Sequence, residues 1–382
     1  MALKKVVSLD IGSSNLRAIE VSLKKDKTID SILNITSLPL ATQIIKNGSL
    51  ESYDAFLAAV KELWSRGNIK TKDVIIGING QSVISRIVPH VAMEKDEATF
   101  EQTLPFKMKE AFPAGVNNYH LGHHVVAEYI DPEKNRVFRD VIVVGIEKSN
   151  LDPILDALKK ATLNVYSVDI SPLAVIRATL QSPENFGKRF ASIDIGGDVT
   201  TIVVHKNGYP EYIRSITGIG GNIINAHIAH DLKMSSEDAE VEKFKALSRG
   251  TFTAQKNTSV FGGGDVEGLV PGSPEAQLAQ SINMIVAQEV TIIIKQIRDT
   301  LTNAITFSNV IDSPINEVIL SGGGAGIHTI ASRMENELAI PVLYGNPFVN
   351  KASKQINKRI AEGTLNPYEY MTAFGLLLGG KF

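Results

Sequence analysis

The 382-residue sequence contains no cysteine, which excludes disulfide bonds, thiolate chemistry and cysteine-bound zinc. It also has little net charge, −2 from 39 basic and 41 acidic residues, which excludes an overall electrostatic attraction to nucleic acid. No run approaches the ~18 uncharged apolar residues of a membrane-spanning helix. The first apolar stretch ends at Asp10, too soon for a signal peptide. We therefore expect a cytoplasmic protein without direct membrane insertion.

Apolar runs and helical stripes alternate along the chain, which is typical of an α/β protein. The spacing of apolar residues predicts helices over residues 53–66 and 274–307, the second of them unusually long. Between residues 83 and 160 the pattern changes to short strands around two helices, which indicates an inserted α+β module. Residues 248–274 are rich in Gly, Ser and Thr and have little periodicity, which is typical of a loop or insertion.

An internal repeat gives the main indication of architecture. Residues 6–14 match residues 190–198, so that Asp10-Ile11-Gly12 corresponds to Asp194-Ile195-Gly196, and each copy continues into a second β-rich run. Glycine lets backbone amides approach phosphate oxygens, and an aspartate at a strand end can hold Mg²⁺ through water. One Asp-x-Gly alone is an ordinary turn. Two copies across a cleft would supply two carboxylates and two amide nests to one nucleotide.

A third element follows the second repeat. Residues 317–321 form a predicted strand, followed by a turn from Gly322 to Gly326 and a helix to about residue 338. Such a turn lets a flat ring or a phosphate approach the backbone. It is not a dinucleotide fingerprint, because Ile327 occupies the last glycine position, and no P-loop sequence occurs anywhere in the chain. The turn at residues 218–222 either lines the same cleft or simply begins a helix.

These motifs, in this order and spacing, resemble the phosphate 1, phosphate 2 and adenosine motifs of the actin-fold ATPases. Within that superfamily the chain is most similar to the PilM family of type IV pilus assembly, and next to the FtsA family of cell division. Residues 239–243, Ala-Glu-x-x-Lys in pattern, resemble the helix that both families place beside the nucleotide. Residues 104–119 resemble the inserted 1C subdomain of PilM, and residues 168–174 resemble its returning helix.

The resemblance implies a duplicated actin-like, ribonuclease-H-like α/β fold with two lobes around a nucleotide cleft. Residues 1–186 would form the first lobe, with the 1C subdomain inserted at about residues 83–160. Residues 187–362 would form the second lobe, with a 2B subdomain at about residues 223–305. Residues 363–382 would contribute a C-terminal helix that returns to the first lobe.

The resemblance also implies which residues of this sequence form the nucleotide site, by the positions that match the family's motifs. Asp10 and Asp194 would hold Mg²⁺ through water. The phosphates of ATP or ADP would be held by Gly12, Ser13, Ser14, Gly196, Gly197 and Asp198, with Arg17 as a basic partner. The nucleoside would be surrounded by Gly221, Glu240, Lys243, Gly323 and Gly324. The alternative for Asp198 is that its side chain points to solvent. No residue stands out as the one that positions an attacking water, so at most slow ATP hydrolysis is expected.

The family implies an ATP-binding adaptor of the type IV pilus, or of a related type II secretion-like platform. It would bind the cytoplasmic N-terminal tail of a PilN-type inner-membrane protein, and be recruited to the membrane by it. Pilus motor ATPases, a platform protein and self-association are further expected partners. The alternatives are an FtsA-like filament protein and a sugar-kinase-type enzyme. A metal site at His120-x-x-His123-His124 is disfavoured, because strand residues 120 and 123 lie on opposite faces.

Overall fold

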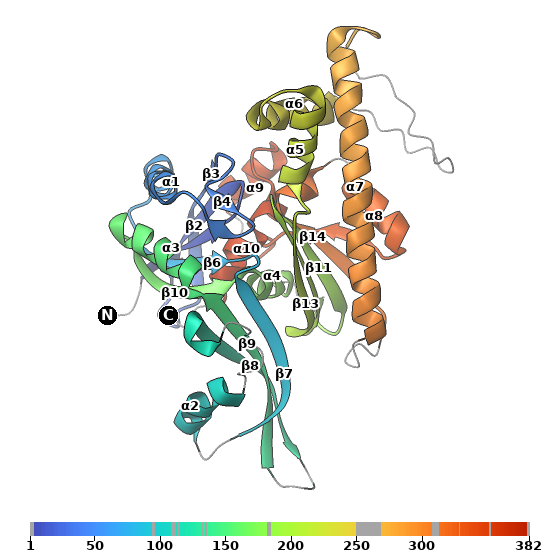
Figure 1. Ribbon diagram of the computed structural model, residues 1–382. Helices are drawn as coiled ribbons and strands as arrows, with labels where there is room; N and C mark the ends of the chain where they lie inside the picture. The colour runs from blue at the N-terminus through green and yellow to red at the C-terminus, as the bar shows by residue number, and fades with distance from the viewer. Residues whose placement is uncertain are drawn as a thin grey trace.

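Two lobes, each built on a five-stranded sheet, make up most of the molecule (Figure 1). The computed structural model describes residues 4–379 apart from 94–95, 108–111, 113–114, 132, 134–135, 182–184, 250–268, 308–312, 328 and 351–352. Most of the glycine-rich stretch 248–274 therefore lies outside the described residues. Within the described part of the chain, no helix combines the length and the apolar character that crossing a bilayer requires.

The first sheet has the strand order β10-β6-β1-β2-β3. Its strands are β1 (Lys5–Ile11), β2 (Asn15–Leu23), β3 (Ile29–Pro39), β6 (Asp73–Ile78) and β10 (Asn164–Ile170). Both faces are covered, because α1 (Tyr53–Arg66) and α3 (Lys148–Lys160) pack on one and α10 (Met371–Leu376) packs on the other. Burial on both faces explains why β1 is almost continuously apolar, with Val6, Val7 and Leu9 fully buried.

The second sheet has the strand order β13-β12-β11-β14-β15. Its strands are β11 (Arg189–Ile195), β12 (Val199–Lys206), β13 (Tyr209–Thr217), β14 (Glu317–Ser321) and β15 (Val342–Tyr344). One face carries α5 (Gly221–Leu232), α6 (Ser236–Arg249), α7 (Pro274–Phe307) and α8 (Ile330–Leu338). Against the other face lie α4 (Ser171–Thr179) and Met371 of α10, so these two helices separate the sheets.

The two sheets have the same topology, which confirms the duplication predicted from the repeat. In each, three antiparallel strands are followed by two parallel ones, and the repeated motif forms the turn of the first hairpin. The turns also have the same hydrogen bond: Gly12 N donates to Asn15 O at 3.1 Å, and Gly196 N donates to Val199 O at 3.0 Å. The duplicated α/β fold with two lobes expected from the sequence is therefore confirmed.

A third sheet, β7-β9-β8, extends away from the first lobe (Figure 1). It consists of β7 (Val83–Ala92), β8 (Tyr119–Asp131) and β9 (Arg136–Glu147), and α2 (Glu97–Lys107) packs on it through Phe100 and Leu104. The sequence pattern predicts that α3 belongs to this inserted module. In the structure, the buried residues of α3 belong to the core of the first lobe instead, because its apolar stripe faces α1 and the first sheet.

Shorter elements complete the chain, and one boundary differs from the prediction. The returning helix was predicted over residues 168–174, but residues 168–170 end strand β10 and the helix α4 begins at Ser171, directly before Pro172. Proline is favoured in the first turn of a helix because backbone N–H groups there have no acceptor within the helix, so its lack of an N–H costs no hydrogen bond. The remaining elements are β4 (Ile45–Lys46), β5 (Ser49–Leu50), α9 (Lys354–Ala361) and the 3₁₀ turns Val116–Asn118, Gly323–Gly326 and Pro367–Tyr370.

Candidate nucleotide-binding site

A cleft of about 340 Å³ lies between the two lobes, where the turns after β1, β11 and β14 meet. The carboxyl ends of parallel strands form it, as is usual for ligand sites in open α/β sheets. Every residue that the sequence analysis assigned to the site lines this cleft, except Asp198. The lining residues predicted from the sequence are Asp10, Gly12, Ser13, Ser14, Arg17, Asp194, Gly196, Gly197, Gly221, Glu240, Lys243, Gly323 and Gly324.

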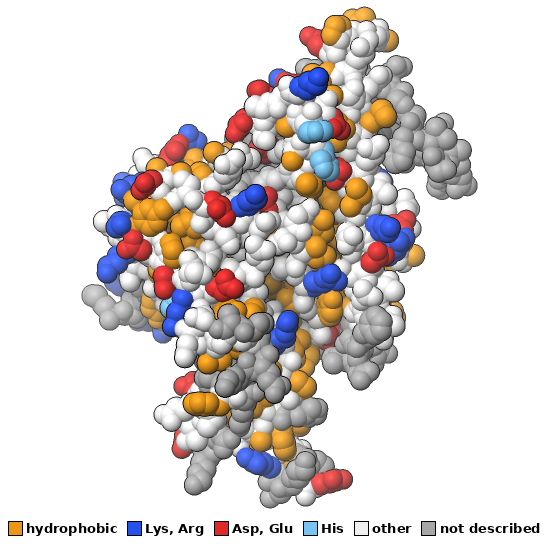
Figure 2. All heavy atoms as spheres, in the orientation of Figure 1, with side chains coloured by type: hydrophobic (Ala, Val, Ile, Leu, Met, Phe, Trp, Pro, Cys, Tyr) orange, Lys and Arg blue, Asp and Glu red, His pale blue; other side chains and the backbone are white. Residues whose placement is uncertain are grey.

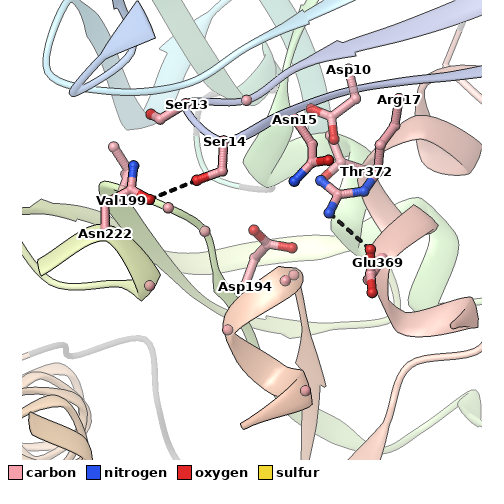
Figure 3. A pocket seen from close by; sticks show the side chains of 18 of the residues that line it. Asp10, Ser13, Ser14, Asn15, Arg17, Asp194, Val199, Asn222, Glu369 and Thr372 are labelled. Carbon is pink, nitrogen blue, oxygen red and sulfur yellow. Dashed lines mark hydrogen bonds and ion pairs between the residues drawn. The ribbon is translucent and has the colours of Figure 1, made fainter. Parts of the chain in front are cut away.

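Asp10 and Asp194 extend into the cleft from equivalent positions of the two sheets (Figure 3). Burial raises the pKa of Asp10 to about 7; Arg17 opposes this shift and the charge of Asp194 adds to it. Burial also raises the pKa of Asp194, although Ser321 Oγ donates a hydrogen bond of 2.8 Å to its carboxylate. Two carboxylates whose charged forms are costly without a counter-ion are suited to binding a cation.

Arg17 follows the first turn and lies opposite Asp10 in the hairpin register. Its side chain is almost fully buried, and its Nη2 donates to Glu369 Oε2 at 3.0 Å (Figure 3). Glu369 lies in the 3₁₀ turn before α10, so this ion pair joins the C-terminal segment to the floor of the cleft. Arg17 Nε is buried and has no partner among the described residues. One donor of this guanidinium therefore remains for an anionic ligand.

The turns approach one another so closely that glycine is required. A Cβ on Gly197 would lie 2.2 Å from Ser14 Oγ, which itself donates a hydrogen bond of 2.8 Å to Asn222 Oδ1. Gly322 has a φ of +86°, and its Cβ would lie 2.4 Å from Ile195 O. Backbone amides thus surround a space that side chains at these positions would fill.

Asp198 has a different place from either of the two predicted for it. Its Oδ2 accepts a hydrogen bond of 3.0 Å from Asn47 N in the first lobe, and its Oδ1 accepts one of 2.8 Å from Asn222 Nδ2 in the second. Asn79 makes a similar bridge between the lobes, since its Nδ2 donates to Thr201 Oγ1 at 2.9 Å. Asp198 therefore holds the two lobes together beside the cleft, rather than facing phosphate or open solvent.

The far end of the cleft is formed by α6 and the glycine-rich turn after β14. Lys243 is nearly buried there, its Nζ donates to Asn225 Oδ1 at 2.6 Å, and burial lowers its pKa to about 8. Glu240 lies one helical turn before it and partly offsets this shift. The exposed ring of Phe244 and the half-buried ring of Tyr368 also line this end. Two aromatic rings and a buried cation are suited to a base and a sugar.

Several lining residues were missed from the sequence. They are Asn15, Asn79, Phe244, Tyr368, Glu369 and Thr372, whereas Asn222 belongs to the turn at residues 218–222 that was predicted as a possible part of the cleft. Asn15 directly follows the first motif, so inspection of the neighbouring polar residues could have found it. Glu369 and Thr372 carry no local signal, because only the return of α10 to the first lobe brings them to the cleft.

The residues of the cleft fit a magnesium–nucleotide complex. Mg²⁺ retains waters and is typically bound by one or two carboxylates together with substrate phosphates, which matches Asp10 and Asp194. The unpartnered Arg17 Nε and the glycine-lined turns match phosphate oxygens. The volume falls within the ~300–1,000 Å³ of sites for small ligands.

The strand histidines are engaged in other contacts. His120 Nε2 lies 2.6 Å from Asp152 Oδ1, and the ring of His123 packs edge-on against Phe100 at 6.0 Å between centroids. No group of three or more His, Asp or Glu side chains that could hold a metal ion occurs in the described part of the chain.

Comparison with solved structures supports the fold. A structure of the PilM–PilN type IV pilus biogenesis complex is similar with a TM-score of 0.74 and 19% identity, covering 98% of both chains. The ethanolamine utilization protein EutJ from Carboxydothermus hydrogenoformans gives a TM-score of 0.54 and 14% identity, over 100% of this chain and 91% of that chain. At these identities both structures show the fold alone.

Sequence comparison gives the family. Cell division protein FtsA from Bacillus subtilis (strain 168) is 26% identical over 399 residues, covering 97% of this chain and 82% of the relative. The family model of cell division protein FtsA matches residues 191–375. The model described as type IV pilus assembly protein PilM matches residues 8–255, more than half of the chain and all of the first two cleft turns. This chain therefore belongs to the family of the type IV pilus assembly protein PilM.

Proposed function

We propose that this chain is an ATP-binding adaptor of type IV pilus assembly. It binds ATP or ADP with Mg²⁺ in the cleft, and it binds the cytoplasmic N-terminal tail of a PilN-type membrane protein, which recruits it to the inner face of the membrane. The observation that carries the proposal is a cleft with two facing carboxylates in a chain that resembles a PilM–PilN complex structure along its whole length. The expected motor and platform partners belong to the same proposal.

The residues of the cleft have separate roles in this proposal. Asp10 and Asp194 orient Mg²⁺ through water, and the amides of the turns at Gly12 and Gly196 bind phosphate oxygens. Bound Mg²⁺ supplies neutralisation of the phosphate charge. Arg17 remains paired with Glu369 and uses its free Nε toward the same charge. No residue stands out in the sequence as the one that positions an attacking water, so we propose slow or absent turnover.

Nucleotide binding is tested by thermal unfolding with and without Mg-ATP. A protein that binds a ligand only when folded gains about 2.7 kcal/mol at a ligand concentration of 100 times Kd. Combining Asp10→Ala with Asp194→Ala should abolish this gain. Asp73→Ala, at the opposite end of the same sheet, is the matched control and should keep it. If the double variant responds to Mg-ATP as the unmodified protein does, the site is wrongly assigned.

The partner is tested with a synthetic N-terminal peptide of a PilN-type protein from the same genome. We propose that the peptide binds where the inserted sheet meets the first lobe, as an extended segment that uses edge hydrogen bonds and apolar anchors. Replacing residues 83–147 by a short linker keeps α3, which the first lobe needs for its core. Micromolar binding that this variant loses supports the adaptor; binding that survives the deletion contradicts the proposed location.

An FtsA-like filament is the second candidate. Two observations favour it: the FtsA family model matches residues 191–375, and the B. subtilis protein is similar over 97% of the chain. Sedimentation with and without Mg-ATP separates the two candidates. Nucleotide-dependent polymers without peptide binding would favour the filament, whereas peptide binding by a non-sedimenting protein would favour the adaptor.

A further inference from the structure

Exposed lysines gather at the end of the first sheet that lies opposite the nucleotide cleft. The parallel strands β1, β6 and β10 all begin at this end, and their other ends carry Asp10, Asn79 and Ser171 into the cleft. Lys5 begins β1 and Lys72 directly precedes β6. The last turn of α3 places Lys159 and Lys160 before β10. Asn164 N donates to Lys72 O at 2.8 Å, so these strand entrances are neighbours.

The turn between β2 and β3 adds further lysines at the same end. Leu23 N donates to Lys4 O at 2.9 Å, and Lys24 N donates to Thr28 O at 2.9 Å, which places residues 24–27 beside the start of β1. We call the whole group the lysine end. It consists of Lys4, Lys5, Lys24, Lys25, Lys27, Lys70, Lys72, Lys159 and Lys160, all of them exposed.

The charge of this surface is strongly positive although the protein is not. Five carboxylates lie among the nine lysines: Asp26, Asp30, Asp73, Asp156 and Glu20, which accepts a hydrogen bond from Thr71 between Lys70 and Lys72. An excess of four positive charges remains, whereas the whole chain has a formal charge of −2, so the rest of the protein carries −6. Within the described residues, Lys160 is the only lysine of the group with an ion pair, to Asp156 at 3.2 Å. Figure 2 shows Lys and Arg side chains, with Asp and Glu side chains between them, along the margin over α1 and α3.

Most of the carboxylates in the group are already used by neutral donors. Asp26 Oδ1 accepts hydrogen bonds from Thr28 N and Oγ1, which lower its pKa more than Lys24 does. Asp73 Oδ1 accepts from Asn164 Nδ2 at 2.7 Å. These acids therefore also stabilise turns and strand entrances, and their charges are already subtracted in the excess given above.

We propose that the lysine end is a docking surface for an anionic lipid bilayer. All nine cations are lysines, which act as hydrated point charges on flexible stems and suit a disordered field of lipid phosphates. A membrane-anchored partner would also bring the protein close to a bilayer, and this part of the argument rests on the proposed function.

The proposal has a geometric consequence. Because the parallel strands of the first sheet run from the lysine end to the cleft, a membrane at one end leaves the cleft facing away from the lipid. The nucleotide site would remain open to the aqueous phase while the protein is docked. Binding through charge alone involves no insertion, so it would be reversible and would weaken with salt.

Vesicle co-sedimentation tests the proposal with the whole chain. The unmodified protein should bind phosphatidylcholine vesicles that contain phosphatidylglycerol, and should not bind phosphatidylcholine alone. Each lysine near an anionic surface contributes on the order of fivefold to the partition coefficient. The variant Lys24→Gln, Lys25→Gln, Lys27→Gln should thus bind about a hundredfold more weakly. These residues lie in an exposed turn, so thermal unfolding should confirm an intact fold.

Matched controls distinguish this surface from others. The variant Lys233→Gln, Lys245→Gln, Lys295→Gln removes three exposed lysines of the second lobe and should bind the vesicles normally. Equal loss in both variants, or equal binding to neutral vesicles, would overturn the proposal. A third result would also overturn it: the vesicles bind neither protein, whereas double-stranded DNA binds the unmodified protein and does not bind the Lys24/Lys25/Lys27 variant. The vesicles carry no protein, so the two proposals are tested separately. If the protein binds vesicles and does not bind the PilN-type peptide, only the proposed function is rejected.

Discussion

Asp10→Asn should make the ligand-free protein more stable above pH 7, although it removes a proposed ligand of Mg²⁺. Burial raises the pKa of Asp10 from 3.8 to about 7. Below pH 4 the carboxyl is protonated in both the folded and unfolded states, so it does not affect stability. Between pH 4 and 7 only the unfolded chain loses the proton, so stability falls as the pH rises. Above pH 7 the full cost is present.

The size of the effect follows from the shift. One pKa unit corresponds to about 1.4 kcal/mol, so burying the charged carboxylate costs at most about 4 kcal/mol. Water in the cleft reduces this cost, and we expect Asp10→Asn to gain about 2 kcal/mol in the free energy of unfolding at pH 8. At pH 4 the gain should vanish. With Mg-ATP at 100 times Kd, the unmodified protein should become more stable than Asp10→Asn at pH 8. Ligand binding adds about 2.7 kcal/mol to its free energy of unfolding, and the variant lacks this gain.

Urea denaturation at pH 4 and pH 8, each with and without Mg-ATP, measures all of these differences. Asp73→Asn is the control for the response to nucleotide, since Asp73 lies at the other end of the sheet. The reasoning would be refuted if Asp10→Asn destabilised the ligand-free protein at pH 8. That result would mean that attraction to Arg17 outweighs burial, and that the aspartate is structural rather than held ready for a cation.

Three further predictions follow from the cleft and the contacts between lobes. Gly197→Ala should weaken nucleotide binding at least about tenfold in calorimetry, because its Cβ would lie 2.2 Å from Ser14 Oγ, and adding Ser14→Ala should restore part of it. Phosphate release should stay below about one per second with or without sugar acceptors; a faster rate that needs an acceptor would favour a kinase. Tyr209→Phe should lower the free energy of unfolding by about 1 kcal/mol, since Tyr209 donates a hydrogen bond of 3.2 Å to Asp140 in the inserted sheet; an unchanged denaturation midpoint would show that this contact contributes nothing.

The cleft could be predicted from the sequence largely because its chemistry is local. Each turn is a short run in which a buried strand ends in aspartate or serine and then glycine, and the duplication places two such runs symmetrically. Asp198 shows the limit of this reasoning. It follows the motif directly, yet its carboxylate accepts hydrogen bonds from Asn222 of its own lobe and from Asn47 of the first lobe, and only the closure of the lobes brings Asn47 near.

Residues contributed by distant segments could not be predicted in this way. Glu369 is 352 positions from Arg17, and no pattern in either segment indicates the pair. The assignment of α3 failed for a related reason. Its amphipathic spacing predicted a helix, but the spacing does not determine which of two neighbouring cores the apolar side of the helix packs against.

The return of the C-terminal segment to the first sheet affects how the protein folds during synthesis. Phe374 and Leu376 complete the core under Val6 and Ile75, so the core on one face of the first sheet stays incomplete until the second lobe has been translated. Such distant contacts slow folding, and exposed strands invite aggregation in the meantime. Chains truncated before residue 370 would expose this apolar face permanently. We therefore expect the first lobe, expressed alone, to be insoluble, and a separately supplied peptide of the C-terminal helix to improve its recovery.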